Sequence, residues 1–189
     1  LIGFSGAPWT LATYMIEGQS SDDKVNARRM LHEAPDLLDD LLDTLVEAVV
    51  DYLKLQIDAG ADAVQLFDSW AGCLSPQGFD KACVGPIRRI VDALPQQVPV
   101  IVLAKDMAHL TGGLHRMHAD VQSVGWTTGL RTTADALPDG VAVQGNLDPV
   151  VLDTTPEIVR EQTRQILLDM EGRPGHIFNL GHGIHPTAE

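Results

Sequence analysis

The stretch Val-Ile-Val-Leu-Ala-Lys-Asp, residues 100–106, consists of five apolar residues followed at once by two charged ones. A continuous apolar run rich in β-branched residues is typical of a strand that is buried on both faces, as in a parallel sheet. The charged pair would then lie just past the carboxyl end of that strand. This stretch therefore predicts an α/β fold and marks the edge of the sheet at which polar side chains gather.

Further runs of the same kind recur along the whole chain, at residues 1–4, 63–67, 121–126, 141–144 and 176–180. Helical patterns separate them. The clearest spans residues 35–59, where leucine, valine and isoleucine recur at spacings of three and four and Gly60 follows as a stop. The chain is thus predicted to be one continuous series of alternating strands and helices, a single domain over residues 1–189.

Two Pro residues mark the starts of further helices. Ser75 before Pro76 and Thr155 before Pro156 are typical of a capping residue followed by the first helical position. In the second helix the buried stripe is predicted to contain five apolar residues: Ile158, Val159, Ile166, Leu167 and Met170.

An alternating series can form a doubly wound sheet or a (β/α)8 barrel. Neither GxGxxG nor GxxxxGK[ST], the phosphate-binding turns of doubly wound nucleotide binders, occurs. Polar residues follow almost every predicted strand, and in a barrel such positions converge on one mouth. We therefore predict a TIM barrel of which about six βα units are present. Because Leu1 opens an apolar run without an initiator Met, we expect about two units before it, and a few residues after Glu189, to be absent.

The composition narrows the choice of partners. The formal net charge is −13, which argues against nucleic acid, since phosphate binding needs clustered Lys and Arg. Four Asp residues between positions 36 and 43 are expected to lie on a solvated helix face. No apolar run approaches the roughly 18 residues that cross a bilayer. With only two cysteines, Cys73 and Cys83, we expect a reduced, cytoplasmic setting.

Five segments, in the same order along the chain, resemble signatures of the uroporphyrinogen decarboxylase family. They are Leu-Ile-Gly-Phe-Ser-Gly-Ala-Pro-Trp-Thr-Leu-Ala-Thr-Tyr-Met-Ile-Glu-Gly (1–18), Gln-Leu-Phe-Asp-Ser-Trp-Ala-Gly (65–72), Ala-Lys-Asp (104–106), Gln-Gly-Asn-Leu-Asp-Pro (144–149) and Asn-Leu-Gly-His-Gly-Ile (179–184). The resemblance implies a (β/α)8 barrel and a homodimer. It also implies an enzyme that removes the four acetate carboxyls of uroporphyrinogen III to give coproporphyrinogen III, without metal or organic cofactor. The protonated pyrrole ring of the substrate would be the electron sink.

The resemblance also assigns site residues. Tyr14 and His182 match the family's active-site tyrosine and histidine, and Ser69 matches a position that contacts substrate carboxylates. Phe4 and Phe67 match apolar positions beside the ring. From the residues alone, Tyr14 could be a core residue, His182 a loop histidine, and either Phe part of the barrel core.

Three positions stay open at this point. Asn146 and Asp148 could shape a loop and cap a helix, or could act directly. Lys105 could attract a carboxylate or pair with Asp106. Gly125 stands where family members often carry Asp, which puts the local strand packing in doubt.

The resemblance places the family's substrate arginines and pyrrole-binding aspartate upstream of Leu1. We therefore expect the 189-residue chain alone to be inactive and, with open strand edges, to associate. The alternatives are a cobamide- or zinc-dependent methyltransferase on a related barrel, or a non-catalytic tetrapyrrole-binding protein. The methyltransferase would need a His-x-Cys pair, which does not occur, and the two cysteines read as ordinary buried thiols.

Overall fold

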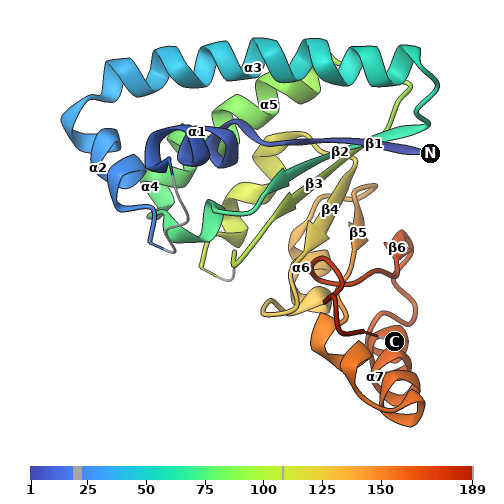
Figure 1. The fold of residues 1–189 in the computed structure, drawn as a ribbon. Helices are drawn as coiled ribbons and strands as arrows, with labels where there is room; N and C mark the ends of the chain where they lie inside the picture. The colour runs from blue at the N-terminus through green and yellow to red at the C-terminus, as the bar shows by residue number, and fades with distance from the viewer. Residues whose placement is uncertain (19–22, 108, 189) are drawn as a thin grey trace.

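The computed structural model describes residues 1–18, 23–107 and 109–188, which form a parallel six-stranded sheet with helices packed on it (Figure 1). The strands lie side by side in chain order, with every neighbouring pair parallel. Their bounds are β1 Ile2–Gly6, β2 Ala63–Asp68, β3 Val100–Ala104, β4 Val121–Val124, β5 Ala142–Gln144 and β6 His176–Ile177. A doubly wound sheet would reverse its strand order, whereas this order is that of a (β/α) barrel. The predicted class, with about six βα units, is confirmed.

Two strands end earlier than predicted. β4 stops at Val124, because the next carbonyl, that of Gly125, accepts hydrogen bonds from the Thr128 N–H (3.1 Å) and the Asn146 side chain (3.1 Å) instead of a sheet partner. β6 covers only His176–Ile177, and the sheet resumes briefly at a bridge between Leu147 and Leu180.

The connections between the strands are helical. The α-helices are α1 Pro8–Glu17, α2 Val25–Glu33, α3 Pro35–Asp58, α4 Pro76–Phe79, α5 Gly85–Ala93, α6 Leu130–Ala136 and α7 Pro156–Asp169. One π-helical segment, η2 Asp80–Val84, joins α4 to α5. Shorter 3₁₀ segments are η1 Ala71–Cys73, η3 Thr111–Met117 and η4 Pro149–Asp153. No helix within the described ranges is both long and apolar enough to cross a bilayer.

The long helix matches its prediction. α3 buries Leu38, Leu42 and Leu53 along one stripe and ends before Gly60, whose positive φ of 104° suits a residue without a Cβ. On its other side Asp36, Asp40 and Asp43 are exposed or half-exposed, as the acidic pattern indicated.

The two predicted capping residues behave differently. Ser75 accepts a hydrogen bond from the Gly78 N–H (3.2 Å) at the start of α4. Thr155 lies at the N-cap of α7 and Pro156 is its first residue, as predicted, but the Thr155 side chain makes no capping hydrogen bond.

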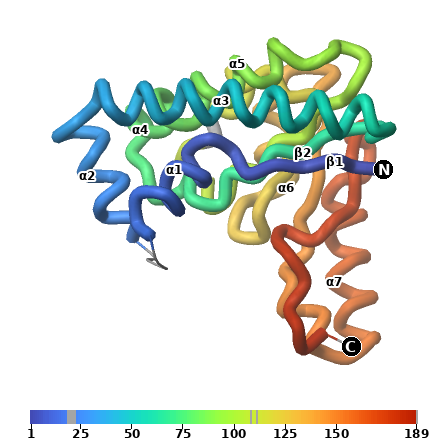
Figure 2. The backbone as a smooth tube through the Cα atoms, turned by 45° about the horizontal axis from the view of Figure 1, so that its top comes forward, coloured from blue at the N-terminus to red at the C-terminus, as the bar shows by residue number. Residues whose placement is uncertain are grey.

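The prediction of a buried stripe on α7 is largely wrong. Met170, just past the helix, is buried and Ile166 packs partly against the cluster that contains Leu130 and Val143. By contrast, 45% of Ile158 and 50% of Leu167 is exposed. α7 extends away from α3 and α5 (Figure 2), and of its residues Ile166, near the C-terminal end, packs against that cluster.

The sheet has one face in the core and one facing a cavity. Val64, Leu66 and Val102 alternate toward α3 and α5 and belong to the main buried cluster. The residues between them, such as Phe67 and Leu103, point to the opposite face. Because successive strand residues point to opposite faces, the second set forms the inner wall of the partial barrel.

The sheet is open among the described residues, since β1 pairs only with β2 and β6 only with β5. The β1 edge is nevertheless partly occupied. The Gln56 side-chain amide accepts from the Phe4 N–H (2.8 Å) and donates to the Phe4 carbonyl (3.0 Å), as a neighbouring strand would. A Cβ on Gly3 would lie 2.6 Å from the Gln56 amide oxygen, so this glycine leaves room for the contact. The free edge expected near Leu1 is therefore blocked at Phe4.

Candidate active site

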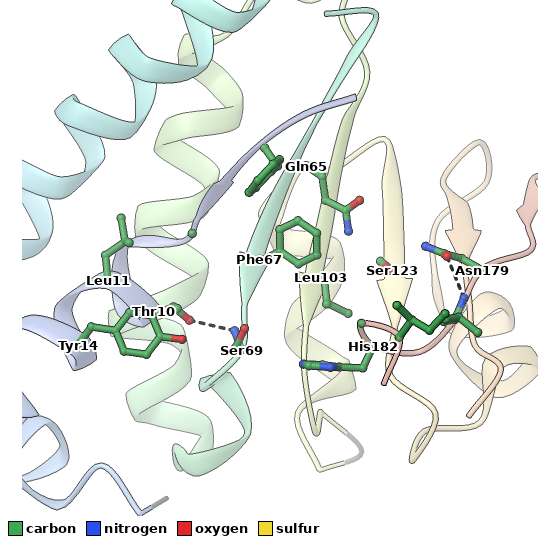
Figure 3. Close-up of a pocket in the computed structure, with 15 residues that line it drawn as sticks. Thr10, Leu11, Tyr14, Gln65, Phe67, Ser69, Leu103, Ser123, Asn179 and His182 are labelled. Atoms are coloured by element: carbon green, nitrogen blue, oxygen red, sulfur yellow. Dashed lines mark hydrogen bonds between the residues drawn. The ribbon is translucent and has the colours of Figure 1, made fainter. Parts of the chain in front are cut away.

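A cavity of about 690 Å³ lies on the inner face at the carboxyl ends of the strands (Figure 3). All five residues singled out from the sequence line it: Phe4, Tyr14, Phe67, Ser69 and His182. They come from β1, α1, β2 and the segments that follow β2 and β6. The barrel topology thus brings together residues that lie up to 178 positions apart (182 minus 4) in the chain.

Tyr14 and His182 approach the cavity from opposite sides (Figure 3). Tyr14 projects from α1 and is 54% exposed, and His182 lies in an exposed position at the other rim. The His182 ring packs edge-on against Trp126, with a centroid separation of 6.0 Å. Neither residue is in the core, so the core reading of Tyr14 is wrong for this structure.

The two phenylalanines form an apolar part of the wall. Phe4 and Phe67 meet edge-to-face with centroids 6.0 Å apart. Phe4 is 62% exposed and therefore does not belong to the barrel core, whereas Phe67 is half-buried. Aromatic faces of this kind are suited to contact with a flat, apolar ring.

Ser69 is held in place through its backbone. Its N–H donates to the Thr10 hydroxyl oxygen (2.9 Å), and the Thr10 hydroxyl donates to the Asp68 carboxylate (2.9 Å). Asp68 is fully buried, and burial raises the pKa of its carboxyl to about 6 despite hydrogen bonds that act in the opposite direction. The Ser69 backbone thereby has a supported position at the cavity wall.

The His182 imidazole is biased toward its neutral form. Partial burial lowers its pKa, and the nearby Lys105 ammonium lowers it further, while Asp106 acts in the opposite direction. Lys105 lies over the Trp126 ring at 5.5 Å and 3.9 Å from the Asp106 carboxylate. At neutral pH His182 can therefore donate one hydrogen bond and accept another.

The cavity combines an apolar, aromatic wall with neutral hydrogen-bonding groups on either side. Its volume falls within the usual range of roughly 300 to 1,000 Å³ for small-molecule sites. Among the described residues that line it, none carries a formal charge at neutral pH. Such a site fits a flat ring with polar substituents at its periphery.

Comparison with known proteins identifies the family. The family model described as Uroporphyrinogen decarboxylase (URO-D) matches residues 1–189. The chain belongs to the uroporphyrinogen decarboxylase family. It is 44% identical over 99% of its length to the Uroporphyrinogen decarboxylase of Alkalilimnicola ehrlichii, and 43% identical over its whole length to that of Geobacter sulfurreducens. It covers 53% and 56% of those two proteins, so the chain spans about half the length of the curated relatives it matches.

Solved structures support the barrel architecture. A methyltransferase from Methanosarcina mazei superposes on the whole chain with a TM-score of 0.85 at 17% identity, and the match covers 54% of that chain. A putative vitamin-B12 independent methionine synthase from Listeria monocytogenes matches 98% of this chain, and 58% of its own, with a TM-score of 0.63 at 10% identity. At these identities the likeness establishes the fold and nothing about the reaction.

The cavity of this member of the uroporphyrinogen decarboxylase family has a polar floor, whose residues were not predicted from the sequence. Gln65 and Ser123 line it, and the Gln144 amide donates to the Ser123 hydroxyl (3.2 Å) and lies 3.5 Å from the Gln65 oxygen. All three are almost fully buried. A polar residue at an inward position of an apolar strand was the available signal for each of them.

Asn146 and Asp148, whose roles the sequence did not decide, lie in the loop after β5 and make structural contacts. Asn146 donates to the carbonyls of Gly125 (3.1 Å) and Thr128 (2.7 Å), and Asp148 accepts from the Val150 N–H (3.0 Å) at the start of η4. These are loop-shaping and capping contacts.

Gly125 lies just past β4 rather than inside it, and a Cβ there would meet only ordinary contacts at 3.7 Å or more. The packing doubt at Gly125 therefore does not arise.

The two cysteines and two of the exposed histidines do not form a metal site with other described residues. Cys83 is fully buried and Cys73 is half-buried, and burial raises the pKa of both thiols. His118 pairs with Asp92 and His185 with Asp153. Within the described ranges, no three residues among His, Cys, Asp and Glu are grouped so that they could hold a metal ion.

The environment of His182 leads to a prediction. Lys105→Met should raise the pKa of His182, because the variant removes the ammonium that opposes protonation and leaves Asp106 unopposed. The pKa is read from an NMR titration of the imidazole C–H resonances. Lys54→Met, an exposed change on α3, is the control. An unchanged or lower pKa in Lys105→Met would contradict the assignment.

Proposed function

We propose that the protein carrying this chain decarboxylates the four acetate side chains of uroporphyrinogen III, giving coproporphyrinogen III and carbon dioxide. The single observation that supports this most is the cavity in which Tyr14, Ser69 and His182 surround the Phe4–Phe67 wall, in a chain of this family. A porphyrinogen offers flat pyrrole rings for the wall and peripheral carboxylates for the polar groups. The relatives carry the same activity in their names.

The chemistry asks the protein for donors and for exclusion of water. A proton adds to the α-carbon of a pyrrole, the electron pair of the bond to the acetate carboxyl moves into the ring, and carbon dioxide leaves. A second proton then reaches the exposed methylene, and the ring loses the first. Hydrogen-bond donors that are already oriented stabilise charge that develops during such steps.

We assign the roles as follows. Tyr14 donates a hydrogen bond to a substrate carboxylate or to an acid that holds the pyrrole N–H groups. His182, neutral at pH 7, donates one hydrogen bond to an acetate or propionate from the opposite rim. Ser69 binds a further carboxylate through its hydroxyl, while Phe4 and Phe67 contact the ring. Each role is supported by the position of the residue at the cavity.

The charge balance bears on this assignment. A substrate with eight carboxylates needs cations, but the chain carries 13 Lys and Arg against 26 Asp and Glu, and none of the cations lines the described part of the cavity. Lys105, behind Trp126, is a cation that acts on a cavity residue from outside it. The homodimer implied by the family resemblance and the cytoplasmic location expected from the two cysteines stay predictions.

The direct test is to give the natural gene product that contains residues 1–189 anaerobic uroporphyrinogen III and separate the products by chromatography. We expect coproporphyrinogen III and the intermediates with seven, six and five carboxylates. Tight porphyrinogen binding without product would favour a carrier instead. A strict requirement for zinc or a cobamide, tested by chelation and add-back, would favour the methyltransferase.

Residues 1–189 expressed alone are expected to be inactive and to associate. The sheet has an open edge at β6 and an edge at β1 that is blocked only at Phe4, and apolar side chains lie in water nearby: 51% of Ile2, 62% of Phe4 and 62% of Ile184 is exposed. Each Å² of apolar surface left in water costs about 25 cal/mol. Sedimentation velocity measures association, and the product assay measures activity. A monomeric, active chain would contradict both expectations.

A further inference from the structure

The start of α1 is tied to the end of β2 and the residues just after it by three residues, Ala7, Trp9 and Thr10. The Ala7 N–H donates to the Phe67 carbonyl (2.9 Å), and the Trp9 indole N–H donates to the Trp70 carbonyl (3.1 Å). Thr10 adds a third tie, because its hydroxyl bonds both Asp68 and the Ser69 N–H. The first two ties need nothing from the β2 side chains, because they end on carbonyl groups. The Asp68 carboxylate is therefore the point at which the β2 sequence determines the junction.

The direction of each hydrogen bond at Thr10 is fixed by chemistry. A backbone N–H can only donate, so the Thr10 oxygen accepts from Ser69. The hydroxyl has a single proton, and that proton is directed to the Asp68 Oδ1 atom (2.9 Å). Removal of the acceptor on Asp68 would free the hydroxyl to rotate, and removal of the hydroxyl would break both contacts at once.

Asp68 has a costly environment for a carboxylate. It is 0% exposed, and its second oxygen has no partner of standard hydrogen-bond geometry in the described part of the chain, although the Cys83 thiol and the Trp70 N–H act on the group. The pKa of about 6 reflects this burial. A buried, incompletely bonded acid contributes little to stability by itself. Its bond to Thr10 is the contact that reaches the cavity.

We propose that Asp68 is a positioning residue, which acts through the Thr10 hydroxyl to fix Ser69 and Tyr14 relative to each other at one side of the cavity. Tyr14 follows Thr10 by four positions on α1, so both lie on the same side of the helix and both line the cavity. The Asp68–Thr10–Ser69 bonds therefore set the spacing between two groups that come from different elements. The use of uroporphyrinogen as the substrate in the test rests on the proposed function, whereas the hydrogen-bond geometry does not depend on it.

The test compares matched variants of the natural gene product that contains this chain. Thr10→Val keeps the shape of the side chain and removes the hydroxyl, whereas Thr10→Ser keeps the hydroxyl. Thr13→Val is the control, because Thr13 is equally buried on the same helix but its hydroxyl donates to the Thr10 carbonyl (2.7 Å). Asp68→Asn keeps an acceptor at Oδ1, and Asp68→Leu removes it.

The first measurement needs no substrate. Hydrogen exchange of the Ser69 amide, followed by NMR, should become about 5- to 10-fold faster in Thr10→Val and Asp68→Leu, the change expected for one lost hydrogen bond of about 1 kcal/mol. Thr10→Ser, Asp68→Asn and Thr13→Val should stay within about two-fold of wild type. In the decarboxylation assay Thr10→Val and Asp68→Leu should raise KM about 5- to 10-fold with a smaller change in kcat. The reason is that Ser69 binds a carboxylate in the substrate and in the transition state alike.

Three outcomes would overturn the proposal. The first is an unchanged exchange rate of the Ser69 amide in Thr10→Val. The second is an equal increase of that rate in Thr13→Val. The third is an increase in Asp68→Asn as large as that in Asp68→Leu. If Asp68→Leu does not fold, the Thr10 and Thr13 variants decide alone, because they leave the buried carboxyl intact. If the exchange data agree but uroporphyrinogen is not a substrate, the proposed function fails while the positioning role stands.

Discussion

Tyr14→Phe and His182→Ala are each expected to lower the rate of uroporphyrinogen decarboxylation by about 10²- to 10³-fold, the usual cost of losing an oriented donor in a water-excluded site. Both residues are exposed in the free protein, so the full effect requires a bound macrocycle that covers them. Losses nearer the lower figure are expected if other donors share the substrate charge. The measurement is kcat and KM for the first decarboxylation.

The fold should survive both changes, because neither side chain is part of the buried core. Two matched controls are available. Tyr52→Phe removes the hydroxyl of a tyrosine with the same 54% exposure on α3, and His32→Ala removes an exposed histidine on α2. Both controls should keep wild-type turnover and unfolding midpoints. Wild-type turnover in Tyr14→Phe and His182→Ala would contradict the roles assigned to these two residues in the reaction.

Much of the architecture could be read from the sequence because the strands are short, apolar and followed by polar residues. In a parallel sheet this pattern has one simple solution, with helices outside and the strand ends together. Ser69 and His182 follow β2 and β6, so their convergence was implied by the topology before any contact was known. Tyr14 lies beyond β1 on α1, and its place at the same cavity was predicted from the family signature.

The errors have a different origin. The α7 stripe was inferred from the spacing of Ile158 and Leu167, but spacing gives the side of a helix on which residues lie, not whether anything covers that side. Gln56 supplies the converse case. Its amide occupies a strand edge that reads as free, because a side-chain contact across 52 residues leaves no local pattern.

The cavity support was equally hidden from the sequence. Asp68 is one of 26 acidic residues, and nothing in the neighbouring letters distinguishes a fully buried carboxyl from a solvated one. Its role depends on Thr10, 58 positions away, which the fold brings within hydrogen-bond distance. Alternation within strands identifies which side chains face inward, but hydrogen-bond partners across the junction require the three-dimensional structure.

Gly181→Ala is expected to lower the stability of the fold and to displace His182. A Cβ at position 181 would overlap the Trp126 backbone nitrogen and lie 2.9 Å from its Cβ and 3.0 Å from its Cα. Trp126 follows β4 closely, and Gly181 itself donates to the Leu147 carbonyl (2.8 Å), so neither backbone can move aside freely. Overpacking of this kind costs about 1 to 3 kcal/mol.

The comparison that tests this uses the glycine on the other side of His182. A Cβ added at Gly183 would have no neighbouring atom within 4 Å among the described residues, so Gly183→Ala should leave the unfolding midpoint unchanged. Gly181→Ala should lower it by about 2 to 12 °C, since 1 kcal/mol corresponds to about 2 to 4 °C for a chain of this length. Because the Trp126–His182 ring contact depends on the same segment, the His182 resonances should shift in Gly181→Ala. Equal midpoints for the two variants would show that the loop after β6 can move away from Trp126, and His182 would then lack the fixed position that its proposed role requires.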